Sequence, residues 1–388
     1  MKNIDEELVC FFNSNDFQRK SKIVNFLKEK KDWGKKKAKA EILLRSIADQ
    51  FGKGQIYTEL IKNNLRIYED AVKKTLPTHR DHFVHSAYVY LLGVYIFNKD
   101  SDYQQQVESN FNSNQPLTKK NGFDWRKEFE FRWTITSIFH DLAYPIEILA
   151  KQINDYQSKI DRRNKSKEEK SIGFDLFNFE EMISFEYLQP LDPLLQQQHF
   201  KMRETSQYIY ADNVFDILAC NFQFKFLNYG YETIHKILAD KFLKKVKSGE
   251  IDHGIMGSVI LANWVHDLYL NNKWDSEVFY CSIGDCLGAI ALHTCQLWLP
   301  DLFKRKIVMA KHPLAYLLVL CDELQDWQRP SGEEILASSN FMDSTRYFKL
   351  AWKDKKIFIN YRDKQKTRKK IEDLKKRIDP IKVEESKA

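Results

Sequence analysis

The 388-residue sequence has little glycine and proline, with 13 and 9 residues, and it has no long hydrophobic run. With 43% hydrophobic and 30% charged residues, this composition excludes collagen-like, low-complexity and membrane-bundle proteins. The longest apolar stretches, such as residues 314–321, are far shorter than the roughly 18 residues that a membrane span needs. The N-terminal segment MKNIDEELVCFF has no apolar region followed by a small-residue cleavage site. We therefore expect no secretory signal, no membrane partner and a cytoplasmic location.

Cysteine is also scarce, and several well-known catalytic motifs are missing. The six cysteines contain no CxxC pair, which predicts reduced and mostly packed thiols. The sequence has no GxxxxGK[ST] loop, no GxSxG elbow and no HExxH helix. The chain therefore lacks the parts that P-loop, α/β-hydrolase and zincin chemistry require.

Positive charge is concentrated at the C-terminus. The whole chain has 61 Lys and Arg against 54 Asp and Glu, and its net charge is +7. Residues 353–388 alone hold 14 Lys and Arg against 7 Asp and Glu, so this tail contains the entire surplus. A solvated helix face is the first interpretation of such a pattern, and contact with nucleic acid or another polyanion is the second.

Helical periodicity dominates the sequence and predicts a mainly α protein with three parts. Residues 1–76 form an N-terminal helical extension, and residues 77–330 form a helical domain with insertions near 98–122 and 150–250. The polar stretches 98–122 and 158–172 are expected to be loops. In residues 340–388, apolar and polar residues alternate on both sides of a Lys/Asp turn, which predicts a β-hairpin, and a charged helix follows.

Five positions on apolar helices stand out as a possible metal site. They are the inward-facing His85, the dyad His140–Asp141, His253 after the helix cap Asp252, His293 within an apolar helix, and Asp322 directly after the apolar residues 314–321. Each has a purely structural alternative, such as a core histidine or a capping pair, but a buried carboxylate at Asp322 needs a partner. Mixed His/Asp ligation without thiolates fits first-row divalent ions better than structural zinc.

In this order, the five segments RDHFVHSAYVYLLG, SIFHDLAYP, DHGIMGSVIL, AIALHT and YLLVLCDELQDW resemble the motifs of the HD-domain superfamily of metal-dependent phosphohydrolases. The resemblance covers residues 77–329 and implies an all-α core that holds one or two divalent ions (Mn, Fe, Ni, Zn or Mg). By motif position, the first metal would bind to His85, His140, Asp141 and Asp322. The second would bind to Asp141, His253 and His293, with Asp141 as the bridge. The spacing of 55 residues between His85 and His140 leaves the choice between His82 and His85 open.

The resemblance implies hydrolysis of a phosphate ester, in a nucleotide or signalling nucleotide, by a metal-bound hydroxide. Two metals about 3.5–4 Å apart clamp a phosphate and activate water. The candidates for binding the phosphate are Arg80, Lys311 and Arg329. The candidates for the acid that protonates the leaving group are His82 and His312, with Lys311 beside His312. Tyr144 and Trp327 are the candidates for stacking on a base. A non-catalytic HD module that senses a nucleotide or binds a partner is the alternative function. A nuclease that uses the basic tail is the third.

Overall fold

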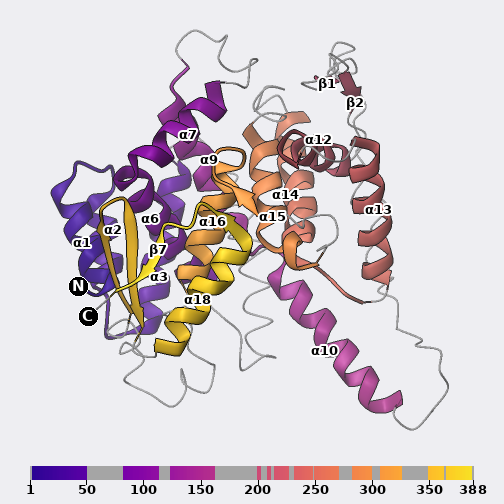
Figure 1. Ribbon diagram of the computed structural model, residues 1–388. Helices are drawn as coiled ribbons and strands as arrows, with labels where there is room; N and C mark the ends of the chain where they lie inside the picture. The colour runs from indigo at the N-terminus through magenta and orange to yellow at the C-terminus, as the bar shows by residue number, and fades with distance from the viewer. Residues whose placement is uncertain are drawn as a thin grey trace. The chain divides into compact units, whose positions relative to one another are not determined.

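The computed structural model (Figure 1) describes residues 2–49, 82–112, 123–161, 199–201, 208–210, 214–226, 231–247, 249–270, 282–298, 306–325, 348–361 and 364–386. These residues are mainly helical with a few short strands, which confirms the predicted fold class. They fall into two compact units, which we describe separately. Unit 1 comprises Met1–Ser113, Asp124–Ile138 and Lys306–Ala388, and unit 2 comprises Asn114–Phe123 and Phe139–Arg305. Among the described residues, no helix has the length and apolarity that crossing a bilayer requires.

Unit 1 is organised around the helix α6 (His82–Lys99), which is buried along almost its whole length. Four helices pack against α6: α1 (Ile4–Ser14), α3 (Trp33–Asp49), α7 (Ser101–Asn112) and α16 (Pro313–Leu324). A short helix, α2 (Lys20–Lys28), lies between α1 and α3 and packs on both. The predicted inward orientation of His85 is confirmed, because its ring is buried together with Val89, Leu92 and Ile96.

A polar cluster ties the N-terminal helices to α6. The Tyr88 hydroxyl donates a 2.6 Å hydrogen bond to Asp5 of α1, and the Lys36 ammonium of α3 donates to the Phe26 carbonyl at 2.8 Å. Burial lowers the pKa of Lys36 to about 8, although the charges of Asp5 and Glu29 oppose this shift. Burying charge is unfavourable unless the group is paired and hydrogen-bonded. Specific polar contacts therefore join α1 to α6 and α3 to α2, in addition to apolar packing.

The prediction of a loop over residues 98–122 is wrong for its first part, because α7 occupies Ser101–Asn112. Asp100 caps this helix by accepting a 3.1 Å hydrogen bond from the Tyr103 backbone N–H. Tyr103, Val107 and Phe111 are spaced four residues apart and are fully buried. This single apolar stripe stabilises a helix whose other faces are polar. Residues 113–122 lie outside the described residues.

The helix α9 (Trp125–Phe139) crosses α6 so closely that a side chain at Gly93 has no room. A Cβ atom built on Gly93 would lie 2.1 Å from the ring of Trp133. The Trp133 indole N–H donates a 3.0 Å hydrogen bond to the Tyr90 carbonyl, and the Ser86 hydroxyl of α6 lies 3.5 Å from the Ile138 carbonyl near the end of α9. These contacts fix the C-terminal end of α9 against the part of α6 that carries His85.

The C-terminal part of unit 1 contains the predicted hairpin and helix. The strands β4 (Phe348–Lys353) and β5 (Lys356–Tyr361) pair antiparallel around Asp354 and Lys355. Both turn residues have positive φ, 50° and 62°, as a two-residue type I′ turn requires. The charged helix α18 (Lys364–Arg377) follows. Two further pairings were not predicted: β7 (Val383–Glu385) joins β5 in parallel, and β6 (Ile378–Asp379) joins β3 (Ile307–Val308) in parallel.

Unit 2 is centred on the helix pair α14 (His253–Leu270) and α15 (Gly284–Trp298), which pack side by side. The helix α10 (Tyr144–Asp161) packs on α14, and α12 (Val214–Phe226) packs on α15 and on α13 (Tyr231–Lys247). The strands β1 (His199–Lys201) and β2 (Tyr208–Tyr210) form a small antiparallel pair. The predicted loop at 158–172 begins too early, because α10 continues to Asp161.

We expect Gly93→Ala to destabilise the protein, because the new methyl group would overlap the Trp133 ring. Overpacking of this kind costs about 1–3 kcal/mol, which should appear as a clear fall in the thermal unfolding midpoint. The matched control is Gly34→Ala in α3, where a Cβ would meet only the Asp32 carboxylate, at 3.3 Å. Equal midpoints for the two variants would contradict the close crossing of α6 and α9.

Candidate metal centre

The sequence predicts that the dyad His140–Asp141 lies on a helix. In the structure it lies in a tight turn between two helices. The helix α9 ends at Phe139, and α10 begins at Tyr144. The Leu142 N–H donates to the Phe139 carbonyl at 3.1 Å, and the Tyr144 N–H donates to the Asp141 carbonyl at 3.0 Å. Pro145 is therefore a residue of the first turn of α10, a position where its missing N–H is tolerated. The turn brings the His140 Nε2 atom to 3.6 Å from Asp141 Oδ2.

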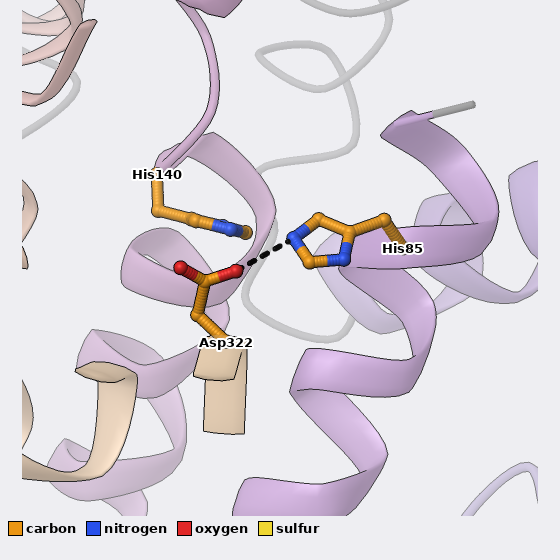
Figure 2. Close-up of side chains that lie close together, drawn as sticks. All are labelled: His85, His140 and Asp322. Carbon is orange, nitrogen blue, oxygen red and sulfur yellow. Dashed lines mark ion pairs between the residues drawn. The ribbon is translucent and has the colours of Figure 1, made fainter. Parts of the chain in front are cut away.

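The first of two groups that could hold a metal consists of His85, His140 and Asp322, whose nearest ligand atoms all lie within 4.8 Å of one another. Figure 2 shows the two imidazole rings and the carboxylate directed toward one another. The His85 Nε2 atom lies 3.2 Å from Asp322 Oδ1, and the Asp322 side chain is 20% exposed. Asp322 is thus half-buried rather than buried, and it has the partner that its position predicts.

The second group consists of Asp141, His253 and His293 and lies entirely within unit 2. His253 is the first residue of α14, and His293 is buried in the middle of α15. Their Nε2 atoms are 3.2 Å apart, and Asp141 Oδ1 lies 3.5 Å from the first and 3.9 Å from the second. Two nitrogens and one carboxylate oxygen therefore converge on one point.

The other ring nitrogen of each histidine in the second group shows how the ring is protonated. His293 Nδ1 contacts the Ile290 carbonyl, which can only accept a hydrogen bond, and His253 Nδ1 contacts the Glu147 carboxylate. Both Nδ1 atoms must therefore donate, and in the neutral rings both Nε2 atoms present lone pairs. Two nitrogen lone pairs at 3.2 Å require a proton or a metal cation between them. These residues fit a metal ion by their chemistry as well as by their proximity.

The electrostatics of the second group favour a cation. Burial opposes a positive charge on His253, but the hydrogen bond to Glu147 and the charge of Asp141 outweigh it and raise the pKa of His253 to about 9. The same negative groups would stabilise a divalent ion at this position.

Both carboxylate oxygens of Asp141 have histidine neighbours. Its Oδ1 atom faces His253 and His293, and its Oδ2 atom lies 3.6 Å from the Nε2 atom of His140, a member of the first group. The two oxygens of this carboxylate therefore face different histidines.

The remaining predicted site residues are placed differently from one another. His82 begins α6 one turn before His85 and is buried, and the Tyr144 ring lies edge-on to the His253 ring with centroids 5.4 Å apart. Lys311 and His312 precede α16, whereas Asp322 lies near its other end, about 15 Å away at 1.5 Å per helical residue. The structure thus brings His82 and Tyr144 close to the ligand residues, and it does not bring Lys311 and His312 there. Arg80, Trp327 and Arg329 lie outside the described residues.

Several residues that support the ligands were not singled out from the sequence. Glu147 holds His253, and Gln325, which caps the C-terminus of α16, contacts His85 Nδ1 through its side-chain oxygen. Their only sequence signal is their spacing: Glu147 lies in the first turn of α10, and Gln325 lies one turn after Asp322.

The helix start at His253 is built as predicted. Asp252 accepts a 2.8 Å hydrogen bond from the Ile255 N–H, which confirms it as the cap, and a 2.7 Å bond from the Thr294 hydroxyl of α15. A Cβ at Gly257, one turn further on, would meet Ala143 N and the Ile290 side chain at ordinary contact distances of 3.7 Å. The close approach occurs at Gly254, where a Cβ would lie 2.1 Å from Thr294 Oγ1.

Comparison of the chain with protein-family models, with curated proteins and with solved structures gives no match.

We expect Asp322→Asn to reduce the thermal stabilisation that added manganese gives to the metal-stripped protein. An amide oxygen is a much weaker ligand than a carboxylate, and a metal stabilises the folded state according to its affinity for that state. The measurement is the difference in unfolding midpoint with manganese and with chelator. The control is Glu323→Gln on the same helix, whose charge pairs with Lys370 and Arg377 and not with the histidines. A full metal-dependent shift in Asp322→Asn would exclude Asp322 as a ligand.

For the second group, we expect His293→Ala to lower the metal content of the purified protein by about one equivalent relative to wild type. Elemental analysis measures this directly. His266→Ala is the control, because His266 is also a buried histidine of unit 2 and belongs to neither ligand group of the described residues. Unchanged metal content in His293→Ala would contradict the assignment.

Proposed function

We propose that the protein is a metal-dependent phosphohydrolase or phosphodiesterase that acts on a phosphate ester of a nucleotide or signalling nucleotide. The observation that carries the proposal is the convergence of the Nε2 atoms of His253 and His293, 3.2 Å apart, with Asp141 Oδ1 beside them. The order of motifs along the chain supports the same conclusion, since it resembles that of the HD-domain phosphohydrolases.

The chemistry of the donor set defines the reaction class. When bound, two divalent ions would supply Lewis acidity toward phosphate oxygens and would lower the pKa of a water molecule. His85, His140 and Asp322 would hold one ion, His253 and His293 the other, and Asp141 would contact both. Mn, Fe, Ni, Zn and Mg are the candidate ions, because the six residues offer only nitrogen and oxygen.

Two residues next to the ligands are candidates for contacts with the substrate. His82, buried at the start of α6, is the candidate for protonating the leaving oxygen, and Tyr144 is the candidate for stacking on a base. Lys311 and His312 are not proposed for these roles, because α16 separates them from Asp322.

A non-catalytic HD module that senses a nucleotide or binds a partner is the alternative function. It would bind metal and nucleotide but would not turn over phosphate esters. A nuclease is the third interpretation, and it would need the exposed lysines of α18. Replacement of the exposed Lys364, Lys369 and Lys375 of α18 by glutamine would weaken salt-dependent binding of DNA or RNA by such an enzyme and would leave hydrolysis of a small phosphodiester intact.

We expect His140→Ala and Asp141→Ala to remove nearly all hydrolysis in a screen of phosphate esters and nucleotides with manganese, iron, nickel, zinc or magnesium. Each change removes a ligand, and Asp141→Ala removes the only candidate bridge between the two groups among the described residues. The controls are His235→Ala in α13 and His199→Ala in β1, since neither residue lies in one of the five motif segments. Loss of activity in the controls, or its survival in His140→Ala and Asp141→Ala, would overturn the proposal.

A further inference from the structure

The carboxylate of Glu147 makes two contacts with the same residue. It accepts a hydrogen bond from the His253 backbone N–H at 3.2 Å and another from the His253 Nδ1–H. The first contact satisfies one of the N–H groups that a helix leaves without a partner at its N-terminus, since His253 begins α14. The second fixes the rotation of the imidazole ring about its side chain. Backbone and side chain are thus held by one group.

Glu147 is close in the chain to the dyad His140–Asp141. Glu147 lies in the first turn of α10, six residues after Asp141, and the Glu147 N–H donates a 3.1 Å hydrogen bond to the Ala143 carbonyl. The turn that carries the dyad therefore also sets the position of the carboxylate that holds His253. One short segment, residues 141–147, supplies a candidate ligand and the orienting partner of another.

We infer that Glu147 is a positioning residue for the second metal, and that it acts by fixing the Nδ1–H tautomer of His253 with Nε2 directed at the ion. This inference rests on the proposed metal-dependent function. A carboxylate that accepts the second N–H of a ligating histidine also increases the electron density on its metal-binding nitrogen. The Ile290 carbonyl has the orienting role for His293, but it carries no charge and no substitution of a side chain can remove it. Of these two orienting groups, Glu147 is therefore the one that a substitution can change.

The role differs from that of a ligand. The two Glu147 contacts are made to Nδ1 and to the backbone N–H, whereas His293 and Asp141 face the opposite ring nitrogen, Nε2. Loss of Glu147 should therefore leave all six candidate ligands in place and weaken only the site that contains His253.

The test compares metal binding by Glu147→Met and Glu147→Gln in the full-length, metal-stripped protein. Methionine keeps the length of the side chain but cannot hold the ring N–H, whereas glutamine keeps one acceptor oxygen and loses the charge. Glu147 is 35% exposed, so neither change buries a new group. Glu250→Gln is the matched control, because Glu250 is also in unit 2 but pairs with Lys245. Zinc affinity and stoichiometry are measured by competition with a chromophoric chelator.

We expect wild type and Glu250→Gln to bind two zinc ions with the same affinities. Glu147→Met should weaken one of the two sites by about 10- to 100-fold, and Glu147→Gln should weaken the same site less. Two sites of wild-type affinity in Glu147→Met would overturn the inference and leave the proposed function standing. A wild-type protein that binds no metal would overturn the proposed function itself.

A second readout gives its main result from the wild-type protein alone. In the zinc-loaded wild-type protein, long-range ¹H–¹⁵N NMR spectra should show His253 with a protonated Nδ1 and with zinc on Nε2. The Nδ1–H signal should be protected from exchange with water in wild type and should be lost by exchange in Glu147→Met. Zinc on Nδ1 of His253 would overturn the inference, even if a variant failed to fold.

Discussion

The candidate metal centre depends on the close approach of α14 and α15, which only a glycine permits. A Cβ atom at Gly254 would lie 2.1 Å from Thr294 Oγ1 and 2.7 Å from the Ile290 carbonyl oxygen. That carbonyl is the group that accepts the hydrogen bond from His293 Nδ1, and Thr294 donates to Asp252, which caps the start of α14. Gly254 thus allows the helix that begins with His253 to lie against the residues that orient His293. Gly93 has the corresponding role in unit 1, where it allows Trp133 of α9 to pack on α6.

The sequence predicts those features that depend on local periodicity. The apolar faces of α6, α14, α15 and α16 and the alternation in β4 and β5 are visible in the residues themselves, and so are the histidines on those helices. The loop predicted at 98–122 failed for a local reason as well. The apolar stripe of this helix has only three members, Tyr103, Val107 and Phe111, and polar residues outnumber them. The composition therefore indicated a loop, although burial of these three side chains stabilises a helix.

Contacts between distant segments could not be predicted. Glu147 and His253 are separated by 106 positions, and His85 and Gln325 by 240, so no spacing rule connects them. The same holds for β7, which pairs with β5 after an intervening helix. The dyad turn is an intermediate case. Pro145 shows that the helix cannot continue, but only the structure shows that the turn starts at His140 and gives Asp141 two directions for its two oxygens.

Many of the positive charges in the basic C-terminal tail form ion pairs within the protein. Lys370 and Arg377 of α18 both pair with Glu323, the residue next to Asp322, and the half-buried Lys382 ammonium donates to Asp100, which precedes α7. Lys356 and Arg368 pair with Glu384 and Glu385 of β7. Exposed ion pairs contribute little each, but the half-buried pairs at Glu323 hold α18 on the helix that carries Asp322. Many positive charges of this segment therefore pair with carboxylates inside unit 1. Among the described residues of α18, the exposed Lys364, Lys369 and Lys375 are left for an external polyanion.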